Sequence, residues 1–115
     1  MVNGDLLLVI RSSALGDGEP DLGEKLIHSF LAQLLEGGDI PARIICQNSG
    51  IFLTTTPDTP ILKLLGHFAE AGTDIQSCGT CLEYYGRQDQ LLIGSSGNMK
   101  DTVRAMLDYQ KVLQI

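Results

Sequence analysis

Short apolar runs alternate with longer amphipathic segments along the sequence, and this alternation constrains the fold more than any other feature. The first run, residues 5–12, is almost fully aliphatic, which is typical of a strand buried on both faces of a parallel sheet. Shorter runs predict four more strands, at residues 42–47, 73–77, 90–93 and 111–115. Helices are predicted between consecutive strands. We therefore expect a single α/β domain over residues 1–115, with a five-stranded, mostly parallel sheet, helices on both faces and right-handed crossovers.

The helix ends are marked by residues that favour them. Asp21 is expected to cap the first helix, which stops at the glycine pair 37–38. Thr59, followed by proline, opens the second helix, and Asn98 opens the last one in a pattern like a capping box. These signals predict where three of the four helices begin.

Three further expectations concern local structure. Residues 51–54 are interpreted as a brief extended piece, and residues 79–85 as a short helix ended by Gly86. In the last helix, the apolar side chains are expected to face the sheet; these are Met99, Val103, Met106 and Leu107.

The composition narrows the classes of function. The chain has 115 residues, of which 43% are hydrophobic and 19% charged, so it is expected to fold around a core. Its formal net charge of −6 argues against a nucleic-acid partner, because such proteins need a basic face. No apolar run approaches the roughly 20 residues of a membrane helix, and the N-terminus shows no signal-peptide pattern. We therefore expect a cytoplasmic protein with no membrane partner.

The strongest chemical signal is a C-x-x-C motif. Cys78 and Cys81 lie between a predicted strand and a predicted short helix. A thiol at a helix N-terminus lies near unpaired N–H groups and the positive end of the helix dipole, both of which favour the thiolate. Cys78 is closer to the strand end, so we expect it to be the nucleophile toward a persulfide or disulfide, with Cys81 one turn further on as a resolving thiol.

Two other interpretations of the motif remain open. The pair is half of a zinc site if Cys46, His28 or His67 comes close in the fold, although no second C-x-x-C supplies the remaining ligands. Otherwise the two are small buried side chains, as free cysteines often are. Cys46 lies within an apolar strand, so we interpret it as a packing residue. No metal and no cofactor is predicted.

The carboxyl ends of parallel strands share one edge of the sheet, and ligands bind at that edge in folds of this kind. Residues 12–20, 47–50 and 78–81 are expected there. We predict catalytic roles for Cys78 and Cys81. The predicted substrate-binding residues come from the same three loops and are Gly16, Asn48, Gly50, Gly79 and Thr80. A phosphate ligand is not expected, because the glycine-rich loop is acidic and lacks a Gly-Lys-Ser/Thr ending.

The segment around the two cysteines is also the most distinctive part of the sequence. It reads Ser-Cys-Gly-Thr-Cys-Leu at residues 77–82 and is followed by a Tyr-Gly pair at 85–86. Less specific features accompany it: the aliphatic run ending at Ile10, Gly-Asp-Gly at 16–18, residues 22–26, Phe30, the Gln-Asn-Ser-Gly turn at 47–50 and Leu-Thr at 53–54. Together they resemble the DsrE-like family, and most closely the C-terminal domain of the YedF proteins.

The resemblance implies a three-layer α/β/α fold, assembly as homo-trimers or hexamers, and a persulfide on a cysteine at a strand end. That cysteine stands eight residues before a helix-terminating glycine in sulfur-relay members, and Cys78 has this spacing to Gly86. Cys81 matches a second cysteine of some relatives. The YedF proteins are linked to selenium metabolism and carry an N-terminal TusA-like domain, which this sequence lacks. The resemblance therefore implies a separate sulfur donor or acceptor, such as a TusA-like carrier protein.

The sequence thus leads to one predicted function and one alternative. We predict a sulfur-carrier, sulfurtransferase-like protein in which Cys78 accepts a persulfide and passes it to a partner. Cys81 then assists release through a disulfide, or protects Cys78 from overoxidation. The alternative is a non-catalytic oligomeric module of the same fold that binds a ligand or a partner.

Overall fold

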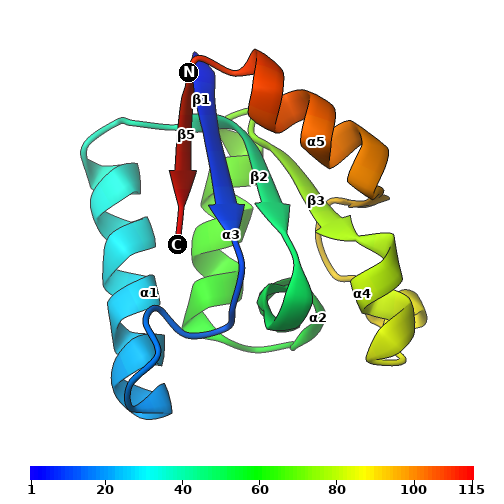
Figure 1. The fold of residues 1–115 in the computed structure, drawn as a ribbon. Coiled ribbons are helices and arrows are strands. Elements are labelled where there is room, and N and C mark those ends of the chain that lie inside the picture. The colour runs from blue at the N-terminus through cyan, green and yellow to red at the C-terminus, as the bar shows by residue number, and fades with distance from the viewer.

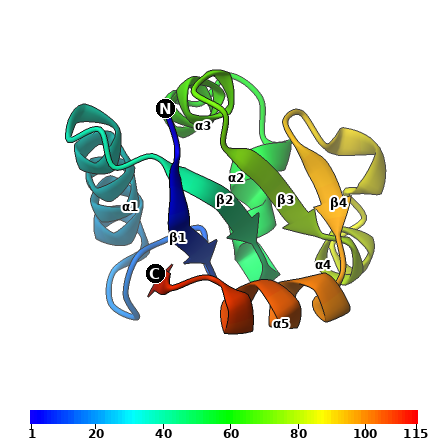
Figure 2. The same ribbon diagram turned by 90° about the horizontal axis from the view of Figure 1, so that it is seen from above.

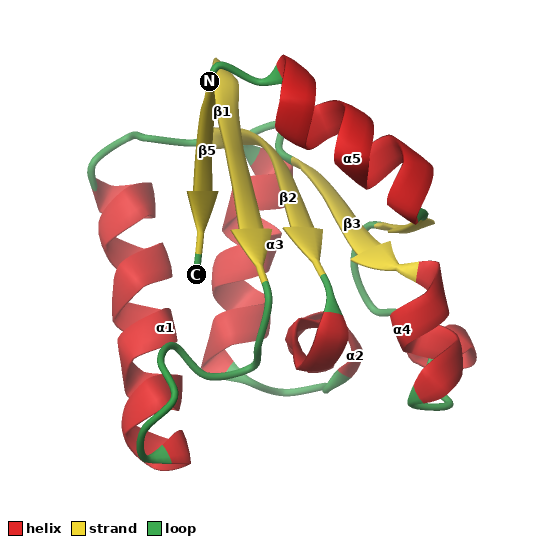
Figure 3. Ribbon diagram, in the orientation of Figure 1, coloured by secondary structure: helices red, strands yellow, loops and turns green.

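A single parallel sheet organises the chain, and its strands all point the same way (Figures 1 and 3). The computed structural model describes residues 1–115. The strand order is β4-β3-β2-β1-β5, and every neighbouring pair is parallel. The elements are β1 (Asn3–Ile10), α1 (Pro20–Glu36), β2 (Pro41–Cys46), η1 (Asn48–Ile51), α2 (Phe52–Thr55), α3 (Pro60–Glu70), β3 (Asp74–Cys78), α4 (Gly79–Tyr84), η2 (Gln88–Gln90), β4 (Ser95–Gly97), α5 (Met99–Asp108) and β5 (Lys111–Gln114), where η denotes a 3-10 turn. The predicted fold class is confirmed.

The sheet is covered on both faces, which explains why β1 is aliphatic throughout. Helices α1 and α3 lie on one side of the sheet and α5 on the other (Figure 2). Leu8 and Ile10 belong to the larger core on the α1 and α3 side, whereas Leu7 and Val9 pack with Ala105 of α5. Successive side chains of a strand point to opposite faces, so only a run without polar positions satisfies both layers.

Two of the predicted helix caps are confirmed. The Thr59 hydroxyl accepts a hydrogen bond from the backbone N–H of Leu62 at 3.1 Å, and the Asn98 side chain accepts one from Asp101 N–H at 2.8 Å. The prediction for Asp21 is wrong: α1 begins at Pro20, its N-cap is Glu19, and no side chain caps it. Proline is itself suited to the first helical position, because the missing N–H has no partner there.

The extended piece predicted at residues 51–54 is also wrong. The chain forms η1 and then the short helix α2. The hydroxyls of Thr54 and Thr55 donate to the carbonyl of Ile51 at 3.0 and 2.9 Å, so the threonines stabilise a helical turn despite their strand propensity. This turn fills the space beyond the end of β2.

The fourth strand is displaced from its prediction. It forms at Ser95–Gly97 rather than at residues 90–93. Within residues 90–93, the Leu92 N–H instead donates a hydrogen bond to the carbonyl of Thr54 at 2.9 Å. Gly94, with φ of +73°, lies against the backbone of Ile75, where a side chain has no room. The strand therefore begins only after this glycine has turned the chain.

Helix α5 presents its apolar side chains to solvent, contrary to the prediction. Met99, Val103 and Leu107 are 58%, 48% and 67% exposed, whereas Thr102 and Ala105 are buried. Small residues on the inner face let the helix lie close to the sheet, and Met106 is half-buried against it. No helix in the structure combines the length and the apolar character that crossing a bilayer requires.

Candidate functional site

The two cysteines of the motif lie at the carboxyl edge of the sheet, as predicted. Cys78 is the last residue of β3 and the N-cap of α4, and Cys81 lies in the first turn of that helix. Both are free thiols; Cys78 is 8% exposed and Cys81 more so. The site therefore combines one thiol at the surface with one mostly covered beneath it.

Asn48 joins the cysteines from η1. Its backbone N–H donates a hydrogen bond to the Cys81 sulfur at 3.1 Å. Asn48 has a left-handed backbone, with φ of +52°, and its side-chain Oδ1 accepts from Ser49 N–H at 2.8 Å and from the Tyr85 hydroxyl at 3.1 Å. These two bonds hold Asn48 in a conformation that non-glycine residues rarely adopt. Asn48 thus contributes a backbone donor to the Cys81 sulfur, and its predicted role in substrate binding stays a prediction.

The environment of Cys81 keeps this thiol protonated. Burial raises the pKa of Cys81, and the hydrogen bond to Cys78 raises it further, as does the charge of Cys78; the Asn48 N–H acts in the opposite direction. The pKa of Cys81 is thus set by its burial, by Cys78 and by Asn48 together.

Cys46 is confirmed as a packing residue. It ends β2, is fully buried in the larger core, and burial raises the pKa of its thiol to about 12. No group of three or more His, Cys, Asp or Glu side chains lies close enough to hold a metal ion. Cys46, His28 and His67 thus do not complete a metal site with the C-x-x-C pair.

An aromatic and cationic cluster borders the cysteines, and the sequence analysis missed two of its members. The Phe52 ring lies 4.7 Å from that of Tyr85, and the Arg87 guanidinium stacks 4.4 Å from the centre of the Phe52 ring. Arg87 also donates to the hydroxyls of Thr55 and Thr56 at 3.0 and 3.2 Å. The adjacent Tyr-Tyr pair before Gly86 was the sequence feature that could have predicted this cluster. Nothing in the sequence linked Tyr85 to Phe52, which is 33 residues away.

A buried hydroxyl pair lies beside the motif. Ser77 precedes Cys78 in β3, and its Oγ lies 2.7 Å from the Thr54 Oγ1 of α2. Both side chains are fully buried. The pair fixes α2 to the end of β3, and with it the turn that carries Asn48.

Two of the remaining predicted binding residues pack closely against backbone, and a role in binding stays a prediction for all of them. A Cβ on Gly50 would lie 2.5 Å from the Ile10 carbonyl oxygen, and one on Gly79 would lie 3.0 Å from that of Gly97, so both glycines serve close backbone packing. Thr80 is exposed at the start of α4, next to the pair. Gly16 is exposed in the loop after β1, with φ of +88°, and nothing in its surroundings links it to the cysteines.

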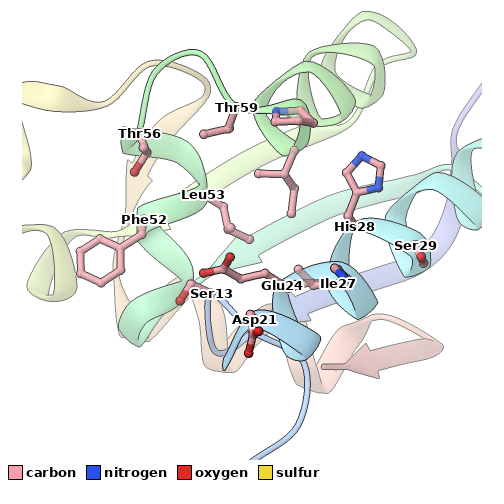
Figure 4. A pocket seen from close by; sticks show the side chains of 13 residues that line it. Ser13, Asp21, Glu24, Ile27, His28, Ser29, Phe52, Leu53, Thr56 and Thr59 are labelled. Atoms are coloured by element: carbon pink, nitrogen blue, oxygen red, sulfur yellow. The ribbon is translucent and has the colours of Figure 1, made fainter. Parts of the chain in front are cut away.

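A cleft of about 970 Å³ opens on the other side of α2, and the sequence analysis did not predict it. It lies between α1, α2 and the beginning of α3 (Figure 4). Phe52 lines it, while the same residue contacts Tyr85 and Arg87 of the cysteine site. The carboxyl edge of the sheet thus carries two neighbouring features, which share Phe52 and the Thr56 hydroxyl that Arg87 contacts.

Comparisons with known proteins establish the fold. No family model matches the sequence, and no curated protein matches it. The structure is similar to the YchN protein from E. coli, with a TM-score of 0.70, 17% identity, and coverage of 98% of this chain and 100% of that one. A protein of unknown function from Methanobacterium thermoautotrophicum gives a TM-score of 0.71 at 13% identity, covering 98% and 100% of the two chains. A conserved protein of unknown function from Bacteroides thetaiotaomicron gives a TM-score of 0.68 at 18% identity, and the match covers 96% of this chain and 95% of that one.

At these identities the likeness shows the fold alone. It supports the DsrE-like architecture that the resemblance implied, over nearly the whole length of the chain. The finer likeness to the YedF proteins stays a prediction. Any activity therefore has to be argued from the site.

Proposed function

We propose that the protein is a sulfur carrier in which Cys78 holds a persulfide. The observation that carries this proposal is the pair of free thiols at the junction of β3 and α4, where the Asn48 N–H donates a hydrogen bond to the Cys81 sulfur at 3.1 Å. Two thiols within one turn of a strand end suit sulfur exchange, because one attacks while the other supplies a hydrogen bond or proton.

The transfer step is an exchange without net oxidation. The Cys78 thiolate attacks the outer sulfur of a donor persulfide R–S–SH, so that a Cys78–S–SH bond forms and the donor S–S bond breaks. The donor leaves as the thiolate R–S⁻. An acceptor thiolate then takes the outer sulfur in the same way and regenerates Cys78. In this proposal the Cys81 thiol, whose sulfur already accepts from the Asn48 N–H, donates a hydrogen bond to the added sulfur.

Cys81 offers a second route for release. Its sulfur attacks the inner sulfur of Cys78–S–SH, forming the Cys78–Cys81 disulfide and releasing H₂S with the Cys81 proton. An external dithiol must then reduce the disulfide before another cycle. The same disulfide protects Cys78 from further oxidation.

The partners belong to the proposal as well. The donor or acceptor is a separate thiol protein, such as a TusA-like carrier, and the protein works as a homo-trimer or hexamer. Selenium is an alternative cargo, because a selenium analogue of the persulfide reacts with the same nucleophile. Mixed-disulfide trapping of a partner cysteine on Cys78 tests for the partner protein. Sedimentation of the purified protein tests the oligomeric state.

Intact-mass spectrometry after incubation with glutathione persulfide tests the carrier itself. The wild-type protein is expected to gain one sulfur atom, Cys78→Ser to gain none, and Cys81→Ser to retain the adduct. Cys46→Ala is the matched control, because it removes a buried thiol and leaves the pair intact. An adduct of equal yield on Cys78→Ser contradicts the proposal.

A non-catalytic binding role is the second candidate, and the cleft beside α2 favours it. Its volume is within the range of small-molecule sites, about 300–1,000 Å³. In this case the cysteines are structural or redox-sensitive, and no sulfur adduct forms on any variant.

A further inference from the structure

The cleft between α1, α2 and α3 has an apolar floor. Ile27 of α1, Leu53 of α2, Ile61 of α3 and Phe52 line it, and Ile27 and Leu53 are 1% and 7% exposed. Figure 4 labels Ile27, Leu53 and Phe52. Water gains little from contact with these side chains, so an apolar body that replaces it binds favourably.

The ionic groups of the cleft all come from one helix. Asp21, Glu24, Lys25 and His28 lie on consecutive turns of α1, and the Glu24 carboxylate is turned into the opening beside Ser13 and Leu53 (Figure 4). Neither carboxylate has a cationic group within 4.0 Å, since the ion pairs of the structure lie elsewhere, at Arg43–Asp74 and Arg104–Asp108. The cleft thus offers two unpaired carboxylates alongside one lysine and one histidine.

The facing wall is polar and carries no charge. Thr56 and Thr59 line it, and each hydroxyl already accepts one hydrogen bond, from Arg87 and from Leu62 N–H respectively. Both hydroxyls therefore keep a proton to donate. They can hydrogen-bond to a neutral polar group of a ligand, but they do not neutralise the carboxylates opposite.

We propose that this cleft binds a small organic ammonium compound, whose apolar body lies on Ile27, Leu53 and Ile61 and whose protonated amine pairs with Glu24. Organic anions are disfavoured, because they would face the Asp21 and Glu24 carboxylates in a protein of net charge −6. The proposal goes beyond the sulfur-carrier function and does not depend on it, because neither Cys78 nor Cys81 lines the cleft.

Three probes with the same aromatic body test the head-group preference: 2-phenylethylamine, 2-phenylethanol and 3-phenylpropionate at neutral pH. Methyl-detected NMR of the full chain follows Ile27, Leu53 and Ile61 during each titration. The amine is expected to shift these methyl signals and to bind about fivefold more tightly than the alcohol, the contribution of one partly exposed ion pair. The carboxylate is expected to bind most weakly.

A pair of charge-matched variants locates the ion pair. Glu24→Gln should weaken binding of the amine about fivefold and leave the alcohol unchanged. Glu36→Gln removes the same charge at the other end of α1 and should change neither. Equal affinity for the three probes, no shifts at the cleft methyls with any probe, or equal losses in the two variants would each overturn the proposal. The sulfur-adduct assay does not involve Glu24, so the two proposals fail separately.

Discussion

Thr54→Val is expected to destabilise the protein more than the double change Thr54→Val with Ser77→Ala. The Thr54 hydroxyl has one proton, and its bond to the Ile51 carbonyl at 3.0 Å uses it. Ser77 must therefore be the donor in the 2.7 Å contact between the two hydroxyls. Valine keeps the shape of Thr54 and leaves a buried Ser77 proton without an acceptor.

The magnitudes follow from this direction of donation. Ser77→Ala removes one neutral hydrogen bond and should cost about 1 kcal/mol of unfolding free energy. Thr54→Val removes two bonds and strands a buried donor, so about 3 kcal/mol is expected. In the double variant no donor is stranded, and the cost should fall to about 2 kcal/mol. The coupling is then about 2 − 3 − 1 = −2 kcal/mol, well outside additivity.

The free energy of unfolding is measured for the wild type, the two single variants and the double variant by urea unfolding. Far-UV circular dichroism follows the unfolding, since the chain has no tryptophan whose fluorescence could be used. Equal slopes of the unfolding free energy against urea show that the variants unfold from the same compact state. If the single costs add up to that of the double variant, or if Ser77→Ala is the costlier single change, the assigned direction of the hydrogen bond is wrong.

The other predictions concern packing, titration and capping. Gly50→Ala should destabilise the protein by more than 1 kcal/mol, because the new methyl meets the Ile10 carbonyl at 2.5 Å, whereas Gly18→Ala, in open space, should be close to neutral in the same urea assay. Burial raises the folded-state pKa of the Cys46 thiol to about 12. The stability that this thiol contributes is therefore complete below pH 9 and is lost as the pH rises toward 12. Over that window the free energy of unfolding should fall up to about 1.4 kcal/mol per pH unit more steeply than in Cys46→Ala. Thr59→Ala should cost about 1 kcal/mol through the lost cap of α3, measured as a lower midpoint of thermal unfolding, and an unchanged midpoint would contradict the capping role.

The sequence predicts the features that depend on local chemistry and periodicity. The run in β1 has no polar position, which indicates burial on both faces, and the structure places separate cores on its two sides. Thr59 and Asn98 are predicted as caps because a side-chain oxygen can accept a hydrogen bond from a free backbone N–H two to three residues later. This bond does not depend on contacts with the rest of the fold. The motif of Cys78 and Cys81 belongs to the same class, since a strand end next to a helix start is a local property.

Features that depend on distant segments are not visible in the sequence. The threonines of α2 have strand propensity, and the contact of Thr54 with Ser77 of β3, 23 residues away, accompanies their helical turn. The apolar stripe on α5 has the period of a buried face, but Ala105 permits a closer approach to the sheet than Met99 or Leu107 does. Gly50 reads as a turn former, whereas its contact with Ile10 is set by how two strand ends meet.

One register position separates the buried Cys46 from the C-x-x-C pair. Cys46 and Ser77 face each other across β2 and β3, so Cys78 lies one residue beyond the last bonded position of β2. Cys46 is therefore enclosed by the core, and burial raises its pKa to about 12. Cys78 instead lies opposite Gly97 of the short edge strand β4 and opens the first turn of α4, which carries Cys81, and the Cys81 sulfur accepts a hydrogen bond from the Asn48 N–H. Sequence composition treats the three cysteines alike, and the difference in their chemistry comes from where β2 stops relative to β3.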